Sequence, residues 1–425
     1  MSGFVFDIDY VRGQFPCLSK TVNGYPAAFL DGPGGSQVPK RVADAVVDYM
    51  YNHNANSHGS FATSKESDAM YWHAKEVYAD FFNCSPCEVA FGANTSSNCF
   101  KLAFGLLRTM EPGDEVIITE IDHEGNRSPW RTLEDFDIVV KCIKVDTETY
   151  TLDFEHFRSL LSEKTKVLAI NWASNATGTV TDVKKFIAEA HKYGAVTVVD
   201  AVHYAPHKII DVKDIDTDVL LCSPYKFFGP HFGAMYCRKE LGEKIKTVRV
   251  MADDNIEMPW RLETGTPSME AACGAAEAVE FIADIGKRHE EFFSQEIKGL
   301  SGRRKDIVAG MLAIDRYEEE MALKLRTELA KLPGVTVYTP AEGVDRTSTV
   351  SFTIDGVHSN VIGTTLGERG IFVWDGDFYA IEIINNVLGL EKDGGMVRVG
   401  FAPYNIMDDV DRVLDTVKEI INQKK

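Results

Sequence analysis

Two residues near the middle of the sequence, Lys226 and Asp200, have the types and surroundings needed for covalent chemistry on an aldehyde. Lys226 lies in the segment CSPYKFFGP, where aromatic neighbours disfavour a charged amine and therefore suit imine formation. Asp200 is the penultimate residue of the apolar run AVTVVDA, and a carboxylate there needs a partner such as a protonated pyridine nitrogen. Taken singly, each has an ordinary alternative: a snorkelling surface lysine and a helix-capping or loop aspartate.

A candidate phosphate site follows the apolar segment 88–92. The residues Gly-Ala-Asn-Thr-Ser-Ser at 92–97 place Asn94, Thr95 and Ser96 between a predicted strand and a predicted helix. Free N–H groups at a helix N-terminus, together with hydroxyl groups, can cradle a phosphate. The simpler alternative is that Asn94 or Thr95 only caps the helix.

Two further polar side chains follow predicted strands. His123, in EIDHEGN, could stack its imidazole on a cofactor ring, although such a histidine can also be a hydrogen-bonded loop residue. Asn175, in ASNATGT, could donate to a ring oxygen, or could simply form a turn. With Lys226, Asp200 and the phosphate cradle, they describe one site for a phosphorylated pyridine aldehyde.

The elements that must position these residues alternate between apolar runs and helical patterns. Strands are predicted at 88–92, 115–119, 166–172, 195–201 and 218–223, and helices at 96–108 and 182–193. Such alternation is typical of a parallel sheet covered on both faces, and ligands of open α/β sheets gather at the carboxyl ends of the strands. The chemically interesting residues all follow strands.

After about residue 290 the pattern changes to a charged helix at 301–332, strands at 334–339 and 349–354, and an amphipathic helix at 408–423. We therefore predict an N-terminal segment at 1–20, a large domain at 21–290 and a smaller C-terminal α+β domain at 291–425.

Composition limits the class of protein. The 425 residues carry a formal net charge of −19, which argues against nucleic acid or an anionic membrane as partner. The N-terminus lacks a signal-peptide pattern, and no apolar run reaches the roughly 18 residues that predict a membrane span. Eight cysteines in such a chain are typical of reduced thiols in the cytoplasm, and Cys84 and Cys87 are read as structural thiols, so no metal site is expected.

Several motifs along most of the chain carry a family resemblance. They are FLDGPGGSQVP, PGDEVI, DHEGNRSPW, ASNATGT, VVDAVHYAPH, SPYKFFGP, ETGTPS and VRVGFAPYN. The chain resembles the class V aminotransferases among the fold-type I enzymes of pyridoxal 5′-phosphate (PLP), and most resembles their cysteine desulfurase-like, SufS-type branch. The resemblance implies the α/β fold of PLP-dependent transferases (aspartate aminotransferase-like), with a mainly parallel seven-stranded sheet in the large domain.

The resemblance also implies roles for individual residues. Lys226 would form the Schiff base with PLP, Asp200 would pair with the pyridinium nitrogen, and His123 would stack on the ring. Arg398 in VRVGFAPYN would grip the substrate carboxylate in a bidentate fork. The other implied cofactor contacts are Asn94, Thr95, Ser96 and Ser223 at the phosphate, Asn175 and His203 near the phenolate oxygen, Tyr225 beside the lysine, and Thr266 reaching the phosphate of a neighbouring subunit in a homodimer.

Three departures from the desulfurase pattern bear on function. His203 stands where the desulfurases usually have glutamine, and Tyr225 stands where they have histidine. More importantly, the chain has no cysteine after Cys273, so the loop 372–380, FVWDGDFYA, lacks the thiol that would accept sulfur as a persulfide.

The sequence leaves the reaction open. A PLP enzyme acting on an amino acid is expected, with β-elimination or another C–S lyase reaction on a cysteine-like substrate as first choice. Transamination, and racemisation or epimerisation, are the alternatives. We expect Trp374, Asp375, Asp377 and Tyr379 to line the side-chain end of the substrate pocket, where two carboxylates would favour a basic or hydrogen-bond-donating substrate. The alternative is a solvated turn with a buried aromatic pair.

Readings from other classes fit less well. A nicotinamide dehydrogenase needs the G-x-G-x-x-G pattern after its first strand, and the segment 32–37, GPGGSQ, lacks the third glycine and precedes the predicted sheet. A scaffold that only keeps the fold should have lost Lys226, Asp200 or Arg398, and all three are present.

Overall fold

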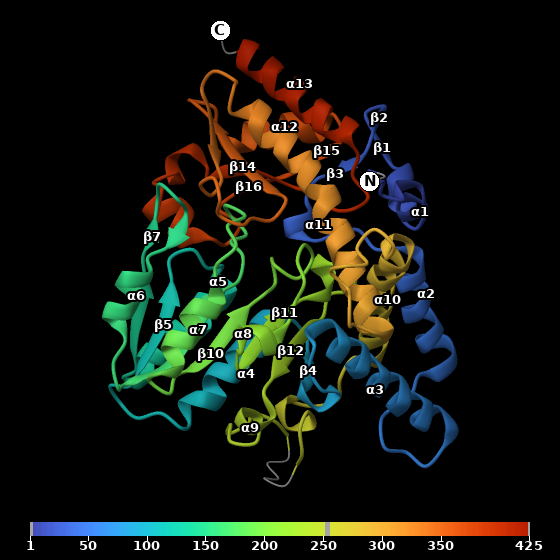
Figure 1. Cartoon of the computed structure of the whole chain (residues 1–425), viewed down its shortest axis with the longest axis vertical. Coiled ribbons are helices and arrows are strands. Elements are labelled where there is room, and N and C mark those ends of the chain that lie inside the picture. The colour runs from blue at the N-terminus through green and yellow to red at the C-terminus, as the bar shows by residue number, and fades with distance from the viewer. Residues whose placement is uncertain (1–2, 251–255, 424–425) are drawn as a thin grey trace.

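A seven-stranded sheet forms the larger part of the protein. The computed structural model describes residues 3–250 and 256–423, so the first two and last two residues of the chain, and residues 251–255 of the predicted large domain, lie outside it. The strand order is β4-β12-β11-β10-β9-β5-β6, and only β12 is antiparallel to its neighbours (Figure 1). The strands are β4 Val89–Gly92, β5 Glu115–Thr119, β6 Val139–Ile143, β9 Thr165–Asn171, β10 Val196–Asp200, β11 Val219–Cys222 and β12 Gly233–Cys237.

These strands are apolar because both faces of the sheet are covered. Successive residues face opposite cores: Val199 and Leu220 belong to one cluster, whereas Val198 and Leu221 belong to the other. The covering helices are α3 Ala62–Phe82, α4 Thr95–Leu107, α5 Glu124–Arg131, α6 Phe154–Leu160, α7 Val183–His191 and α10 Met269–His289. All the strands and helices predicted before residue 224 are confirmed, and each observed end lies within two residues of the predicted one.

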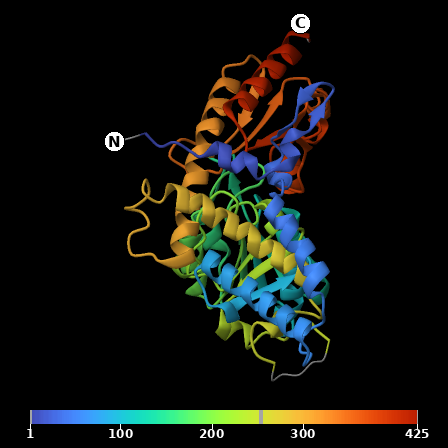
Figure 2. The same ribbon diagram turned by 90° about the vertical axis from the view of Figure 1, so that its right-hand side faces the viewer.

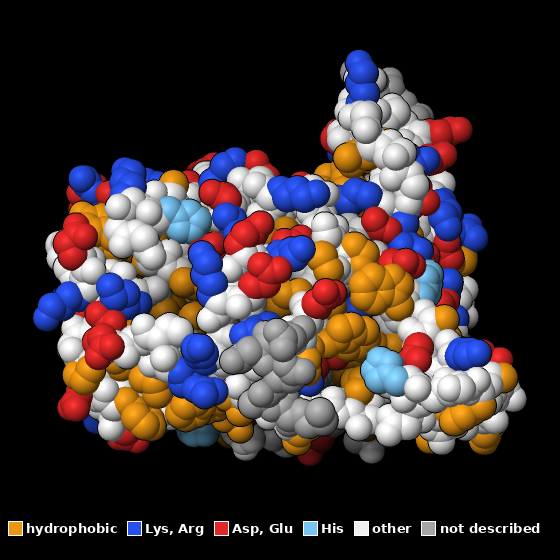
Figure 3. Space-filling model, turned by 90° about the horizontal axis from the view of Figure 1, so that it is seen from below, with side chains coloured by type: hydrophobic (Ala, Val, Ile, Leu, Met, Phe, Trp, Pro, Cys, Tyr) orange, Lys and Arg blue, Asp and Glu red, His pale blue; other side chains and the backbone are white. Residues whose placement is uncertain are grey.

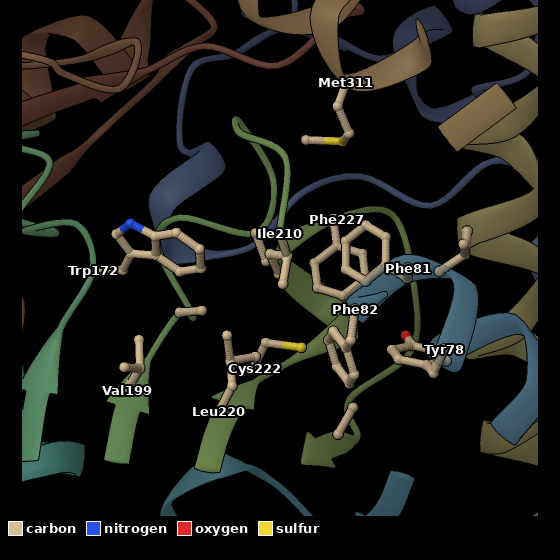
Figure 4. Close-up of a cluster of buried hydrophobic side chains, with 14 of the residues drawn as sticks. Tyr78, Phe81, Phe82, Trp172, Val199, Ile210, Leu220, Cys222, Phe227 and Met311 are labelled. Carbon is tan, nitrogen blue, oxygen red and sulfur yellow. The ribbon is translucent and has the colours of Figure 1, made fainter. Parts of the chain in front are cut away.

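The first of these cores is rich in aromatic side chains. Figure 4 shows Tyr78, Phe81 and Phe82 from α3 packed toward Phe227, which directly follows Lys226. The rings of Phe81 and Phe227 stack with centroids 5.2 Å apart. The residue after the lysine is therefore anchored in the core, which fixes where the lysine backbone lies.

The second sheet of the protein has four strands, in the order β13-β14-β17-β16. Its strands are β13 Val335–Tyr338, β14 Thr349–Ile354, β16 Trp374–Gly376 and β17 Met396–Gly400. Its buried face packs with α11 Gly302–Leu329, α12 Ser359–Glu368 and α13 Met407–Gln423 around a separate core (Figure 1). The predicted helices at 301–332 and 408–423 and strands at 334–339 and 349–354 are confirmed.

Helix α11 joins the two sheets, because it packs on α10 at one end and on β13 and β14 at the other (Figure 2). The crossing of α10 and α11 depends on glycine: a Cβ on Gly286 would lie 1.8 Å from the carbonyl oxygen of Asp306. No larger side chain fits that approach without moving the helices.

Residues 28–31 pair with the C-terminal part of the chain. Strand β3 Ala28–Phe29 pairs in parallel with β15 Ile371–Phe372, and Asp31 forms a bridge with Gly400. The division of the chain at residues 20 and 290 stays a prediction. The remaining short elements are α1 Ile8–Gly13, β1 Thr21–Val22, β2 Tyr25–Pro26, α2 Lys40–Asp48, β7 Val145–Asp146, β8 Thr151–Leu152, α8 Val212–Ile215 and α9 Lys239–Gly242.

Candidate active site

A cavity of about 710 Å³ lies at the carboxyl ends of β9, β10 and β11, where the first sheet faces the second. It gathers residues more than 300 positions apart in the sequence, from Pro33 to Arg398. The sequence-predicted residues on its wall are Asn94, Thr95, Ser96, His123, Asn175, Asp200, His203, Ser223, Tyr225, Lys226, Trp374, Asp375, Asp377, Tyr379 and Arg398. Thr266 is the predicted site residue that does not line it.

Lys226 lies in the short turn that follows β11. Its amine donates a hydrogen bond to the carbonyl oxygen of Pro33 and lies 4.7 Å from the ring centroid of Tyr225. Burial, together with the positive charge of Arg398, lowers the pKa of Lys226 to about 7, against the opposing attraction of Asp200 and Asp31. A substantial fraction of unprotonated amine is therefore present near neutral pH.

Asp200 ends β10 with its carboxylate beside the cavity. One carboxylate oxygen accepts a hydrogen bond from the backbone N–H of Val202 at 2.8 Å. Burial raises the pKa of Asp200 to about 6, although this hydrogen bond and the charge of Lys226 act in the other direction. A cationic ring nitrogen in the cavity would offset the cost of ionising this buried carboxyl group.

The N-terminus of α4 forms the opposite end of the cavity wall. Asn94 caps the helix by accepting from the N–H of Ser97 at 2.8 Å, so the capping alternative for Asn94 is realised. The hydroxyls of Thr95 and Ser223 lie 2.6 Å apart, which joins the helix start to the end of β11. A Cβ on Gly233 would meet the backbone of Asn94 at 2.5 Å, so this glycine permits the close approach. Hydroxyls and a helix start are suited to a phosphate.

His123 precedes α5 on another side of the cavity. Its Nδ1 accepts a hydrogen bond from the N–H of Gly125 at 2.8 Å, which fixes the plane of the ring. Burial and the positive charges of Lys226 and Arg398 lower the pKa of His123 to about 4. The ring is therefore neutral at physiological pH, as stacking on a flat cationic heterocycle requires.

Asp122, directly before His123, is a buried carboxyl group whose titration should make the stability of the protein depend on pH. It accepts hydrogen bonds from the hydroxyl of Thr119 at 2.6 Å and from the amide of Asn126 at 3.0 Å. Burial raises the pKa of Asp122 from 3.8 to about 7, helped by the negative charge of Asp200. The folded state therefore keeps a proton that the unfolded chain releases, and this contribution to stability is lost as pH rises from about 4 to 7.

We expect Asp122→Asn to gain stability relative to the wild type between pH 5 and pH 8, by about 2 kcal/mol. Urea unfolding of the cofactor-free protein at both pH values measures this difference. Asp135→Asn, at an exposed position, is the matched control and should show the same difference at both values. A difference for Asp122→Asn that does not change with pH would contradict the expectation.

Arg398, in β17, brings a buried guanidinium to the cavity from the second sheet. One Nη donates to the backbone oxygen of Asn175 at 2.9 Å, and the ring of Phe378 lies 4.1 Å from the guanidinium carbon. The Nε has no hydrogen-bond partner among the described residues. Burial lowers the pKa of Arg398 to about 9, so the group is still charged at neutral pH and can bind a carboxylate.

The loop from Trp374 to Tyr379 closes one side of the cavity. Asp377 accepts from the N–H of Tyr379 at 3.0 Å and from the amide of Asn385 at 3.3 Å, so both of its oxygens organise the loop. Asp375 accepts from the amide of Asn360 at 3.3 Å through one oxygen, and no partner of its other oxygen lies among the described residues. Trp374 and Tyr379 are 50% and 68% exposed, so the alternative of a buried aromatic pair is wrong.

Tyr225 and Thr266 differ in their relation to the cavity. Tyr225 lines it and stacks on His231, with ring centroids 4.8 Å apart. Thr266 is exposed on the loop between η7 Trp260–Leu262 and α10. That loop is anchored by Glu263, which receives a hydrogen bond from Lys75 at 2.6 Å in the core.

Of the lining residues that were not predicted from the sequence, three adjoin the key groups. Asn171 ends β9 beside Asp200, with which it pairs in register, while Pro33 accepts from Lys226 and Phe378 covers Arg398. The position of Asn171 at a strand end was a usable signal. Phe378 stands between the predicted pocket residues Asp377 and Tyr379, which was also a usable signal, whereas the contact of Pro33 with Lys226 arises only through the tertiary fold.

Unpaired buried atoms support the fit of a ligand to this cavity. Among the described residues, six buried side-chain polar atoms have no hydrogen-bond partner, and three of them belong to Asn171, Asn175 and Arg398 on the cavity wall. Buried polar groups are normally paired, so their concentration here is expected of a site completed by a polar ligand. A carboxylate, a reactive amine, a helix N-terminus and a neutral imidazole are also the set that PLP needs.

None of the eight cysteines lines the cavity, and all eight lie among the described residues. The nearest candidates by sequence are Cys222 and Cys99. Both are fully buried, and burial raises the pKa of each thiol well above its ordinary value. A reactive thiolate is therefore not part of this wall.

Comparisons with known proteins identify the family. The family model of class-V aminotransferases matches residues 28–300 and 306–413. The chain belongs to the class-V aminotransferase family. It is 30% identical to a cysteine desulfurase of Haloferax volcanii, over 97% of this chain and 96% of that protein. It is also 30% identical to the aminotransferase-like protein FGM3 of Gibberella zeae, over 99% of this chain and all of that protein.

A solved structure gives the same result for the fold. The apo structure of the cysteine desulfurase of Thermococcus onnurineus NA1 superimposes with a TM-score of 0.84 and 25% identity, over the full length of both chains. The expected PLP-dependent transferase fold is thereby confirmed, with its mainly parallel seven-stranded sheet. As a member of this family, the protein is an enzyme that uses PLP.

Proposed function

We propose that the protein is a lyase that cleaves the C–S bond of a cysteine-like amino acid by β-elimination. The observation that carries the proposal is the combination of Lys226, Asp200 and Arg398 around a cavity that no cysteine lines. Similarity to a cysteine desulfurase favours a sulfur-containing amino acid as substrate. The absence of a thiol in the described wall argues against the transfer of sulfur to a cysteine there.

The cofactor contacts follow from the wall of the cavity. Lys226 would bind the aldehyde carbon of PLP, Asp200 the ring nitrogen, and the imidazole of His123 one face of the ring. Bound PLP supplies an electron-poor ring that stabilises negative charge at the Cα atom of an attached amino acid. The other contacts we assign are Asn94, Thr95, Ser96 and Ser223 at the phosphate, and Asn175, His203 and Tyr225 near the ring oxygen and the lysine.

Lys226 is also the base in this proposal. Its amine has a pKa of about 7, so near neutral pH it can accept the Cα proton of the substrate. The thiolate then leaves from Cβ with the electrons of the C–S bond and takes up a proton. Hydrolysis of the resulting enamine consumes one water and gives a 2-keto acid and ammonia, so no oxidant or reductant is needed.

Substrate selection would divide between the two sides of the cavity. Arg398 presents an Nε without a partner among the described residues, which suits a substrate carboxylate. At the other end, Asp375 has one uncommitted oxygen and Tyr379 is exposed. We assign Asp375, Asp377 and Tyr379 to the side-chain end, with Asp377 acting through the shape of the loop.

Transamination is the second candidate, because the similar protein of Gibberella zeae is described as aminotransferase-like. It requires the same base and the same carboxylate site but returns the proton to the cofactor. Epimerisation would return it to Cα. Neither releases a thiol, and this difference separates them from β-elimination.

The products decide between these reactions. Purified protein loaded with PLP is incubated with cysteine and with S-alkyl cysteines, and thiol or sulfide, ammonia and 2-keto acid are measured. β-Elimination yields the three in equal amounts. A keto acid without ammonia or thiol would support transamination, and loss of optical activity alone would support epimerisation; either result contradicts the lyase proposal. Failure to take up PLP would support the disfavoured alternative, a non-catalytic scaffold that only keeps the fold.

We further propose that the enzyme is a cytoplasmic homodimer in which Thr266 reaches the phosphate site of the partner subunit. Large apolar side chains are exposed on neighbouring elements of one region, namely Met50 and Tyr51 after α2 and Phe61 before α3. Figure 3, which views the molecule from below, shows apolar side chains gathered in patches among charged ones. All eight cysteines are unpaired, as is typical of a reducing compartment. None of the described helices could cross a membrane. Sedimentation analysis tests the dimer.

A further inference from the structure

His203 is a cavity residue whose ring is held by the second sheet. It follows β10, and its side chain is 5% exposed. Its Nε2 lies 3.0 Å from the hydroxyl oxygen of Thr349 and 3.2 Å from that of Thr347. Thr349 begins β14, so this contact connects the four-stranded sheet to the wall of the PLP cavity.

The hydrogen bonds of the two threonines determine which ring nitrogen carries the proton. Thr347 has a second acceptor for its hydroxyl proton, the backbone oxygen of Gly178 at 3.5 Å. Thr349 is 3% exposed, and Nε2 of His203 is the acceptor that the described residues offer its hydroxyl. If Nε2 carried the proton, the O–H of Thr349 would be buried without an acceptor, which is unfavourable. The arrangement therefore favours Nε2 as the acceptor and places the ring proton on Nδ1.

The surroundings of the ring keep it neutral. The groups that face it are His207, whose ring centroid is 5.5 Å away, and the positive charges of Arg398 and Lys226. Together with burial they hold the pKa of His203 well below its ordinary value. The carboxylate of Glu318 lies 2.7 Å from Nδ1 of His207. A neutral imidazole carries one N–H proton, and the hydrogen bond with Thr349 determines which nitrogen of His203 carries it.

We propose that Thr349 is a positioning residue that fixes the tautomer of His203, so that Nδ1–H is a donor toward the ring oxygen of PLP. This inference rests on the proposed assignment of His203 to that oxygen. The desulfurase-like sequences usually have glutamine here, whose amide is a donor without help. A histidine can donate from Nδ1 only when Nε2 accepts, and this explains the need for a hydroxyl at position 349.

The first test uses the pH dependence of the visible absorbance of the PLP-loaded enzyme. A donor at the ring oxygen favours the deprotonated form of the adjacent lysine–cofactor linkage, because negative charge on the oxygen is then greatest. We expect Thr349→Val to raise the midpoint of the absorbance change by about one pH unit, the equivalent of one hydrogen bond to a charged group. Thr349→Ser keeps the hydroxyl and should leave the midpoint near the wild-type value.

A second variant shows whether Thr349 acts through His203. In His203→Gln, where the donor is an amide, addition of Thr349→Val should not move the midpoint further. An unchanged midpoint in Thr349→Val alone, or an equal shift in both backgrounds, would overturn the inference. Lack of any visible absorbance in the wild type would instead overturn the proposed function.

A measurement without cofactor keeps the inference testable if the valine variant does not fold. The ¹⁵N NMR spectrum of histidine-labelled wild-type protein reports which ring nitrogen carries the proton, and the signals of His203 are identified by their loss in His203→Gln. We expect the Nδ1–H tautomer. The Nε2–H tautomer would contradict the proposal, whether or not PLP binds.

Discussion

Replacement of Lys226 by alanine is expected to lower kcat by about 10⁴-fold or more and to remove the visible absorbance that marks covalently bound PLP. Among the described residues that line the cavity, the amine of Lys226 is the group that can both bind the aldehyde and accept the Cα proton, so its loss removes two functions. The measurements are steady-state release of thiol and keto acid, and the absorption spectrum of the protein after loading with PLP.

Two controls make this result specific. Lys192→Ala removes a lysine whose side chain is 64% exposed, and should leave spectrum and rate unchanged. Addition of methylamine to Lys226→Ala should restore part of the activity, because a free amine can occupy the space of the lost side chain. A Lys226→Ala variant with normal colour and turnover would refute the assignment of the lysine.

Replacement of Arg398 by glutamine is expected to lower kcat/KM for amino acids by about 10²–10³-fold. Bidentate pairing of a guanidinium with a carboxylate is strong in a buried site, and glutamine cannot reproduce either the charge or the fork. The effect should appear mainly as a higher KM, since the carboxylate is bound similarly before and during reaction. Steady-state kinetics with S-alkyl cysteines measure it.

The matched comparison for Arg398 uses the ligand instead of the protein. The amine that corresponds to the substrate without its carboxylate should bind wild type and Arg398→Gln with similar dissociation constants, followed by the change in cofactor absorbance. If the variant weakens binding of the amine as much as that of the amino acid, Arg398 supports the fold of the cavity and does not recognise the carboxylate. Arg398→Lys should behave like glutamine, since lysine cannot form the fork.

Much of the fold could be predicted because the strands of a doubly covered sheet must be apolar on both faces. The run VTVVD in β10 and the run VLLC in β11 contribute alternate residues to two cores, so their composition alone identifies them. The antiparallel strand β12 and its place between β4 and β11 were not predicted, because register and order depend on contacts between distant segments.

The candidate site, like the fold, could be predicted from the sequence only in part. Asp200 ends a strand, and Lys226, His123 and the start of α4 each follow one. Residues at the carboxyl ends of parallel strands converge, so the sequence indicated one site. Phe378 over Arg398, and Thr349 at the ring of His203, join segments about 20 and 146 residues apart, and nothing in their local sequence indicates these contacts.

The sequence by itself indicated the family and the cofactor through motifs along most of the chain that resemble the class V aminotransferases, and it predicted the reactive groups from residue types at the ends of recognisable strands. Only the tertiary structure determined the pKa shifts of those groups and which residues surround them. Burial and the charge of Arg398 lower the pKa of Lys226, and burial raises that of Asp200; both effects arise from packing of the two sheets around one cavity. The thiol-free wall is likewise a property of the folded chain, since cysteines at Cys99 and Cys222 lie close in sequence to the site yet point into the cores.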